Sequence, residues 1–280
     1  MATFTNQASI TLGDNVTNSN VVTGEITTGV TVNKTAATTN YALGDSVTYV
    51  VTINNATATP YNALTLTDNL GAFTVDGNTV VPLDYIEGSL LYYINGVQTV
   101  SPGTAGGPPL AINGINVPAG GTVTLIYEGR VNAFAPLDAG SVLTNTVTLD
   151  LIEDQTASAT VPVREEVRLS IAKAVCPAVI TNGELTYTFI IQNTGNLAVN
   201  ATDGLIVSDV FDPILTNIAV TLNGAPLEEG TGYTYNEATG EFATVNGAVG
   251  VDAATYTRDT VTGATVTTPG ATVITVTGTV

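Results

Sequence analysis

Hydrophobic and polar residues alternate along most of the chain, in short runs that end at Gly, Asn, Asp or Pro. Such alternation is typical of half-buried β-strands, and two of the clearest runs are residues 46–55 and 184–193. Asn-Gly dipeptides, among them those at 95–96 and 223–224, mark hairpin turns. The pattern predicts an all-β protein built from β-sandwich domains of immunoglobulin type.

A repeat underlies this pattern. The segment from Asn6 to Lys34 has a counterpart from Asn145 to Lys173, and the two span the same interval, since 34 − 6 = 28 and 173 − 145 = 28. The chain is therefore expected to contain two related domains in tandem.

The boundaries of these domains follow from the repeat. We expect immunoglobulin-like domains at residues 30–165 and 166–280, preceded by an N-terminal arm of residues 1–29. The charged sequence Arg164-Glu165-Glu166 indicates an exposed connection between the domains.

The two repeats differ in phase. Thr122–Val131, which closes the body of the first repeat, matches Ala271–Val280, so the second repeat has no copy of the Leu143–Leu151 strand after it. The unmatched copy of that strand, Phe4–Leu12, precedes the first repeat. We expect the second domain to be completed by this strand from another subunit, as in donor-strand addition, which gives a head-to-tail homopolymer. The donor strand would use one face, formed by Phe4, Asn6, Ala8, Ile10 and Leu12.

The arm has an alternative place within its own chain, beside the first domain or inside the second. The first domain, however, already has its own strands in residues 142–163, and an arm that reaches the second domain from Thr28 must cross a whole domain. Exchange between molecules is the more economical arrangement.

Lysine, asparagine and aspartate side chains are expected to face the core of each domain. Residues two apart along a strand share a face, so Lys34, one of only two lysines, lies on the apolar face with Val30 and Val32. The same spacing of two places the matching lysine, the asparagines and the aspartates on the apolar faces of their strands. The expected sets are Lys34, Asn145 and Asp68 within a subunit, and Lys173, Asn6 and Asp209 between subunits.

Two arrangements satisfy such buried groups. A lysine with a lowered pKa can attack the asparagine amide while the aspartate transfers protons, which releases ammonia and leaves an isopeptide bond. This resembles the Lys-Asn chemistry of Gram-positive pilus and adhesin domains. The alternative is a buried Lys-Asp ion pair, hydrogen-bonded to the Asn amide, that specifies strand register. The facing pattern alone does not separate the two.

Several short motifs resemble a known module. A Lys-bearing first strand, Gly44-Asp45-Ser46-Val47-Thr48-Tyr49, and the strand Leu64–Asp68 are similar to the conserved-repeat surface module catalogued as domain of unknown function eleven. The second repeat departs from the pattern at Asn182-Gly183-Glu184. The resemblance implies an immunoglobulin-like fold and a surface role, with no specified ligand. The layout also resembles self-polymerising bacterial pilus or spore-appendage subunits.

These observations predict a structural subunit of an extracellular filament on a cell or spore surface. The alternative is an adhesin or surface-layer stalk module that binds a ligand. The chain has no histidine, and no catalytic or metal-binding motif is visible, so we expect no turnover enzyme, no cofactor and no metal. Autocatalytic isopeptide formation would be a single turnover.

The net charge, the single cysteine and the N-terminal residues limit the partners and the location that we expect. With 24 acidic against 6 basic residues, the net charge of −18 disfavours nucleic acid, and no apolar run is long enough for membrane insertion. The single cysteine, Cys176, excludes an internal disulfide. Residues 1–4 show no secretory signal, which fits either a removed signal or release by lysis of a mother cell around a spore. The sequence does not identify a surface anchor or a tip protein as a partner.

Overall fold

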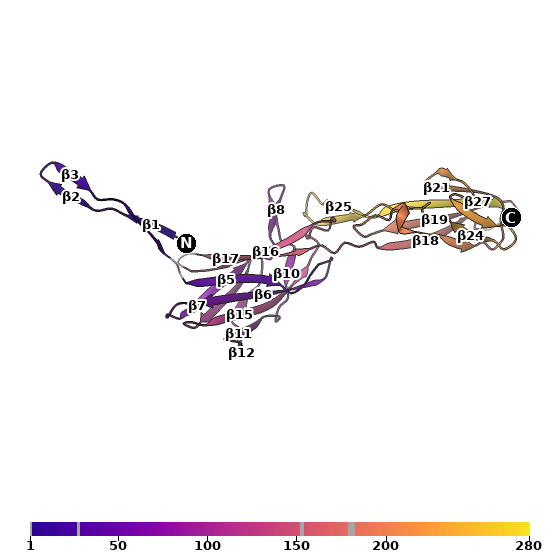
Figure 1. Ribbon diagram of the computed structural model, residues 1–280. Coiled ribbons are helices and arrows are strands. Elements are labelled where there is room, and N and C mark those ends of the chain that lie inside the picture. Colours follow the sequence, from indigo (N-terminus) through magenta and orange to yellow (C-terminus); the bar gives the residue numbers. More distant parts are fainter. Residues whose placement is uncertain (1, 27–28, 152–153, 179–182) are drawn as a thin grey trace. The chain divides into compact units, whose positions relative to one another are not determined.

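The computed structural model describes residues 2–26, 29–151, 154–178 and 183–280. The regular elements of these residues are strands, apart from one 3-10 turn, η1 (Ala201–Asp203), so the predicted all-β class is confirmed (Figure 1). The chain divides into two compact units: unit 1 comprises Met1–Pro136 and Val142–Val163, and unit 2 comprises Leu137–Ser141 and Arg164–Val280. Each unit contains an immunoglobulin-like β-sandwich.

The first sheet of unit 1 has the strand order β12-β11-β15-β6-β5, with β10 also paired to β15. Its long central strands alternate strictly, so that Val47, Tyr49, Val51 and Ile53 are fully buried. The strands are β5 (Val30–Ala36), β6 (Ser46–Asn55), β10 (Leu83–Tyr85), β11 (Leu91–Ile94), β12 (Val97–Thr99) and β15 (Thr122–Val131).

The second sheet of unit 1 has five strands in the order β13-β14-β7-β16-β17. Strand β17 also lies against β5 of the first sheet, which closes the sandwich on that side. The strands are β7 (Tyr61–Asp68), β13 (Gly103–Ala105), β14 (Leu110–Val117), β16 (Val142–Leu149) and β17 (Gln155–Pro162); a separate small hairpin is formed by β8 (Phe73–Val75) and β9 (Asn78–Val80).

Unit 2 repeats this plan with a smaller second sheet. Its first sheet has the order β18-β19-β27-β21-β22, and its second sheet has only three strands, β20-β24-β23. The strands are β18 (Leu169–Cys176), β19 (Glu184–Asn193), β20 (Ser208–Val210), β21 (Thr216–Leu222), β22 (Ala225–Leu227), β23 (Tyr233–Asn236), β24 (Glu241–Thr244) and β27 (Gly270–Thr279); β25 (Thr255–Arg258) pairs with β26 (Thr265–Thr268).

Aromatic side chains hold the core of unit 2 together. Phe211 stacks on Tyr187 with a centroid distance of 4.8 Å, and its ring centroid lies 5.6 Å from that of Phe242. All three belong to a cluster of buried apolar residues from both sheets. Unit 2 therefore has its own core although its second sheet is short.

The N-terminal arm is a two-stranded ribbon rather than the single strand expected. Strand β1 (Ala2–Asn6) pairs with β4 (Val22–Ile26), and β2 (Ser9–Leu12) pairs with β3 (Asn15–Asn18). The turn is Gly13-Asp14, where Gly13 has a φ of 61° that suits the first position of a tight hairpin turn. The sequence comparison predicted one donor strand, Phe4–Leu12, in an arm of residues 1–29, and did not identify this turn.

Candidate functional site

The lysine, aspartate and asparagine predicted for the first domain meet in the core of unit 1. Lys34 on β5 is 3% exposed, and Asp68 at the end of β7 and Asn145 on β16 are fully buried. Lys34 Nζ lies 2.7 Å from Asp68 Oδ2, and Asn145 Nδ2 donates to the same oxygen at 3.3 Å. We call these three residues the unit 1 centre.

Strand register explains this meeting. Val147 on β16 pairs directly with Asp68 on β7, and Asn145 lies two residues earlier, on the same face of the sheet. Lys34 comes from the facing sheet, where it shares the buried side of β5 with Val30. Alternation along three strands therefore directs all three polar groups into one interior point.

Two tyrosines that the sequence analysis missed surround the centre. The Tyr127 hydroxyl donates a hydrogen bond to Asp68 Oδ2. Lys34 Nζ lies 4.5 Å from the ring centroid of Tyr49 and 5.6 Å from that of Tyr127, which are cation–π distances. Both occupy the middle of long alternating strands, and they pair with each other across β6 and β15. The central position of the two tyrosines in their strands was the one feature of the sequence that could have indicated this role, but the same position is also typical of ordinary core aromatic residues.

Burial controls the protonation of these groups. It lowers the pKa of Lys34 to about 8, although the negative charge and hydrogen bond of Asp68 act in the opposite direction. At pH 7 about one tenth of such an amine is neutral. Burial, reinforced by the charge of Asp68, raises the pKa of both Tyr49 and Tyr127, so the two hydroxyls keep their protons.

The Asn145 amide is held at both of its ends. Its Nδ2 faces Asp68, and its Oδ1 accepts a hydrogen bond of 3.2 Å from the Gly71 backbone N–H. A donor at the carbonyl oxygen stabilises the negative charge that develops there when a nucleophile adds to the amide carbon. An amine, a carboxyl group and a polarised amide are the groups required for isopeptide formation, and they equally satisfy one another as a hydrogen-bonded ion pair.

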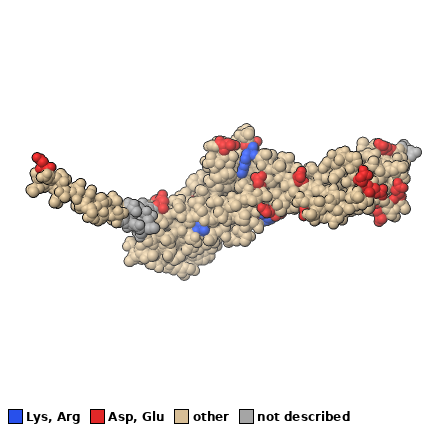
Figure 2. Space-filling model, turned by 45° about the horizontal axis from the view of Figure 1, so that its top comes forward, with Lys and Arg blue, Asp and Glu red and all other residues tan. Residues whose placement is uncertain are grey.

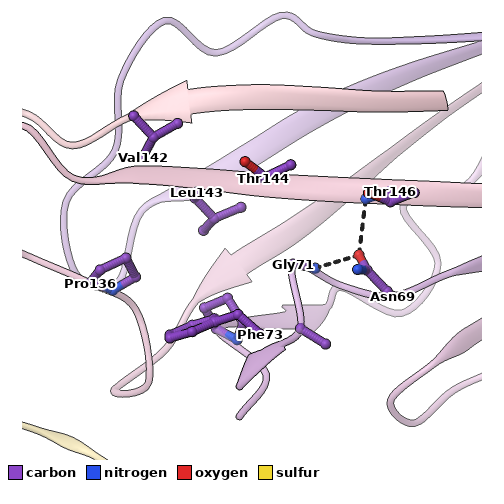
Figure 3. Close-up of a pocket in the computed structure, with 10 residues that line it drawn as sticks. Asn69, Gly71, Phe73, Pro136, Val142, Leu143, Thr144 and Thr146 are labelled. Atoms are coloured by element: carbon purple, nitrogen blue, oxygen red, sulfur yellow. Dashed lines mark hydrogen bonds between the residues drawn. The ribbon is translucent and has the colours of Figure 1, made fainter. Parts of the chain in front are cut away.

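A small pocket of about 320 Å³ adjoins the unit 1 centre (Figure 3). Asn69 links its two sides, because Asn69 Oδ1 accepts from the backbone N–H groups of Gly71 and Thr146 at 3.0 and 2.9 Å. Leu143 and Phe73 point into it in the close-up. None of its lining side chains is ionisable, so the pocket supplies no acid, base or ligand to the centre. Its clearest link to the centre is the hydrogen bond from the Gly71 N–H to Asn69, because the same N–H also donates to Asn145 Oδ1.

In unit 2 the structure brings together two of the three predicted residues. Lys173 on β18 and Asp209 on β20 form an ion pair. Lys173 Nζ lies 4.3 Å from the ring centroid of Tyr187, the counterpart of Tyr49. The third predicted residue, Asn6, lies on β1 of the ribbon, where it pairs with Val22. We call Lys173 and Asp209 the unit 2 centre.

The unit 2 centre is much more exposed than its counterpart. The side chain of Lys173 is 39% exposed and that of Asp209 is 21% exposed, whereas both partners in unit 1 are at 0%. The difference extends along the strand: every residue of β18 is exposed, including Ile171 at 58%. The inner face of β18 thus lacks the cover that β17 gives to β5.

The edge of the short sheet explains this exposure. In unit 1, β7 lies between β14 and β16, whereas in the described part of unit 2 its counterpart β20 pairs only with β24. A shallow hollow of about 350 Å³ lies along β20, β24 and β23 and includes Asp209, Val210 and Phe242 among its lining residues. Unit 2 therefore presents an open sandwich edge with a lysine–aspartate pair at its centre.

The surface offers little other chemistry. Figure 2 shows a face that is mostly uncharged, with scattered acidic side chains and few basic ones. Among the described residues, no group of three or more His, Cys, Asp or Glu side chains is placed to hold a metal ion. No helix in the described part of the chain is long and apolar enough to cross a membrane.

Comparison with known proteins gave only distant structural similarities. No family model and no curated protein matches the chain. Solved structures that are similar include the pilus backbone RrgB of Streptococcus pneumoniae, at 13% identity and a TM-score of 0.35, covering 86% of this chain and 55% of that one. The major pilin BcpA of Bacillus cereus matches at 10% identity and a TM-score of 0.35, covering 95% and 73%.

A biofilm-associated protein B domain matches at 12% identity and a TM-score of 0.30, covering 90% of this chain and 72% of that one. A red sea bream transglutaminase, an enzyme, matches at 10% identity and a TM-score of 0.29, covering 80% and 27%. This chain spans about half the length of the pneumococcal pilus protein. At this level of similarity, these structures do not indicate the function of the chain.

Proposed function

We propose that this protein is a structural subunit of an extracellular filament on a cell or spore surface. In this proposal the N-terminal arm of one copy adds to the open edge of unit 2 in the next copy. The observation that carries it is the contrast between two equivalent strands: β5 buries Val30 and Lys34 at 2% and 3% exposure, whereas β18 leaves the matching Leu169 at 40% and Lys173 exposed.

The arm carries the complementary exposed surface. Phe4 is 49% exposed, Ile10 is 74% exposed and Leu12 is 85% exposed, all on the face of the arm predicted to act as donor. A free sheet edge beside an apolar groove is the usual acceptor of an added strand. One contact between copies would cover both surfaces.

The register of unit 1 specifies how the strands would pair. There, Thr148 of β16 pairs with Thr67 of β7. The arm residue that matches Thr148 is Ser9, since 148 − 139 = 9, where 139 is the offset 145 − 6 between the two asparagines. The residue that matches Thr67 is Ser208 of β20, because Asp68 matches Asp209. Ser9 of one copy would therefore pair with Ser208 of the next, in a head-to-tail contact.

We further propose that the two centres form isopeptide bonds. The neutral Lys34 amine adds to the Asn145 amide carbon, a proton passes through the Asp68 carboxyl to the amide nitrogen, and ammonia leaves. Each bond removes about 17 Da, the mass of ammonia. In unit 2 the same reaction would join Lys173 to Asn6 of the neighbouring copy, with Asp209 as the proton carrier, and would make the filament covalent.

Electron microscopy and light scattering of the 280-residue chain, compared with a chain that begins at Gly29, test the assembly. We expect filaments or rings from the first and monomers from the second. Adding a peptide of residues 2–26 to the truncated chain should give one bound peptide per chain and no polymer. Filaments formed equally well without the arm would refute the donor role.

A further inference from the structure

The donor arm is a ribbon of two strands, so it can enter the next copy either as a single strand or as a paired ribbon. We propose that the whole ribbon, residues 2–26, enters the neighbouring copy as one unit and takes the places that β16 and β17 occupy in unit 1. The inference rests on the proposed filament function and specifies the partner segment at the open edge.

The strand count of the two sandwiches supports two added strands. The second sheet of unit 1 runs β13-β14-β7-β16-β17, and that of unit 2, in the described residues, runs β23-β24-β20. Because β20 corresponds to β7, the two vacant places are those of β16 and β17. A single donor strand would fill only the first.

The exposure of β18 requires the second strand in particular. In unit 1 it is β17, the outer strand of the pair, that lies against β5. A lone strand beside β20 would take the place of β16 and leave β18 without this cover. Leu169 at 40% and Ile171 at 58% exposure would then stay open to solvent in the assembled filament. A ribbon covers them because its second strand lies where β17 lies.

The ribbon reverses direction within one residue of the position expected from the strands that it would replace. Strands β16 and β17 pair symmetrically about position 152, since Leu149 pairs with Gln155, and the repeat offset places this position at 152 − 139 = 13. The turn of the ribbon is Gly13-Asp14. The first strand of the ribbon therefore runs alongside the positions of β16 and the second alongside those of β17.

Around Asn6, the ribbon keeps the face pattern that the site needs. Asn145 pairs with Ala159, whose counterpart is residue 159 − 139 = 20, whereas Asn6 pairs with Val22. The shift of two residues is even, so β4 turns the same alternate residues inward as β17 does. Val22 is 53% exposed, so it offers an apolar side chain on that face. Between β2 and β3 the shift is one residue, because Ile10 pairs with Thr17 whereas its counterpart Leu149 pairs with Gln155, the counterpart of residue 16.

The two faces of the first ribbon strand differ sharply. One face carries Phe4, Ala8, Ile10 and Leu12 around Asn6, whereas the intervening residues Thr5, Gln7, Ser9 and Thr11 are all polar. Strand β16 shows the same division, with Leu143, Asn145, Val147 and Leu149 buried and Thr144 exposed. With its apolar face inward, the ribbon brings Asn6 to Lys173 and Asp209, as Asn145 is brought to Lys34 and Asp68.

Hydrogen exchange on the assembled wild-type chain distinguishes a ribbon from a single strand. We expect the amides of residues 15–26 to exchange at least about tenfold more slowly in the filament than in a monomer whose assembly is blocked by Ile171→Asp. Residues 2–12 and β18 should become protected as well. Filaments in which residues 2–12 are protected while 15–26 exchange as in the monomer would overturn the ribbon and keep the filament function.

A locked ribbon gives a second test. Thr5 and Thr23 pair directly across β1 and β4, on the face opposite to Asn6, so Thr5→Cys with Thr23→Cys should form a disulfide that faces away from the groove. The exposed Cys176 is replaced by Ser to prevent other disulfides. We expect the oxidised and reduced forms to assemble to the same extent, within about twofold.

The outcomes separate the two levels of the proposal. Loss of assembly only in the oxidised form would show that the ribbon must open, which overturns the inference and leaves the filament function intact. If the wild-type chain itself stays monomeric at high concentration, the filament function fails and the ribbon inference fails with it.

Discussion

Replacing Asp68 by alanine tests whether this carboxylate organises the unit 1 centre. Asp68 is fully buried and accepts from Lys34 Nζ at 2.7 Å, from the Leu70 N–H at 2.6 Å, and from Tyr127 and Asn145. Its removal leaves the Lys34 amine buried without a counter-ion. Breaking a buried pair in this way costs about 3–5 kcal/mol of unfolding free energy.

Urea unfolding measures this cost, provided that no covalent bond contributes. The variant is therefore compared with its parent in an Asn145→Ala background, which cannot form the isopeptide bond. For a slope of about 2–3 kcal/mol per molar urea, the expected loss lowers the midpoint of unit 1 by about 1–2.5 M. Intact mass in the otherwise wild-type chain gives the second readout: Asp68→Ala should abolish the loss of about 17 Da that a Lys34–Asn145 bond would produce.

Removing both charges provides the control. Lys34→Met with Asp68→Leu replaces the buried pair by apolar groups, and such replacements are often neutral or stabilising. We expect the double variant to recover most of the stability that Asp68→Ala loses. If Asp68→Ala costs less than about 0.5 kcal/mol, or the double variant is as unstable as the single one, then the electrostatic account of the centre is wrong.

Three further predictions concern the unit 1 centre and the exposed face of β18. In the Asn145→Ala chain, the pKa of Lys34 is lower in the folded state than in the unfolded state, so the unfolded state binds more protons between about pH 8 and pH 10.5. The free energy of unfolding, measured in urea titrations relative to Lys34→Met, should therefore rise across this window by up to about 3 kcal/mol. Tyr127→Phe removes a donor to Asp68 and should cost about 1–3 kcal/mol, measured by thermal and urea unfolding, with no change in filament formation. Ile171→Asp places a charge on the exposed inner face of β18 and should block filament formation in light scattering without unfolding unit 2 by circular dichroism, whereas Ser170→Asp, on the opposite face, should assemble normally.

Alternation was enough to predict which polar residues enter the core of unit 1. Lys34, Asp68 and Asn145 each continue an apolar run at a spacing of two, and a strand has only two faces. The unit 2 pair, Lys173 and Asp209, follows from the same rule and the repeat. The two-residue spacing along each strand therefore predicted which side chains meet in the core, provided that all the strands belong to one sandwich.

The remaining features depend on contacts that periodicity does not encode. Tyr127 is a core aromatic by pattern, and its hydrogen bond to Asp68 follows from the facing of the two sheets. The pairing of Phe4 with Gly24 and of Asn6 with Val22 depends on the Gly13-Asp14 turn, a local signal that the comparison of repeats did not use. The predicted place of Asn6 beside Lys173 concerns a second molecule, and it stays a prediction.

Disulfide trapping between two separately made chains tests whether the arm of one copy pairs with β20 of the next. One chain carries Ser9→Cys and the other Ser208→Cys, both with Cys176→Ser, and they are mixed under mild oxidation. Directly paired residues of antiparallel strands have Cα atoms about 4.5–5.5 Å apart, within the range that a disulfide spans.

We expect a disulfide-linked product that contains one copy of each chain, with the bond located at positions 9 and 208 by peptide mass spectrometry. Mixtures in which Thr11→Cys replaces Ser9→Cys should cross-link far less. A mixture that forms filaments without this disulfide, or a chain with both cysteines that closes only on itself at every concentration, would contradict the claim that the arm of one copy completes unit 2 of the next.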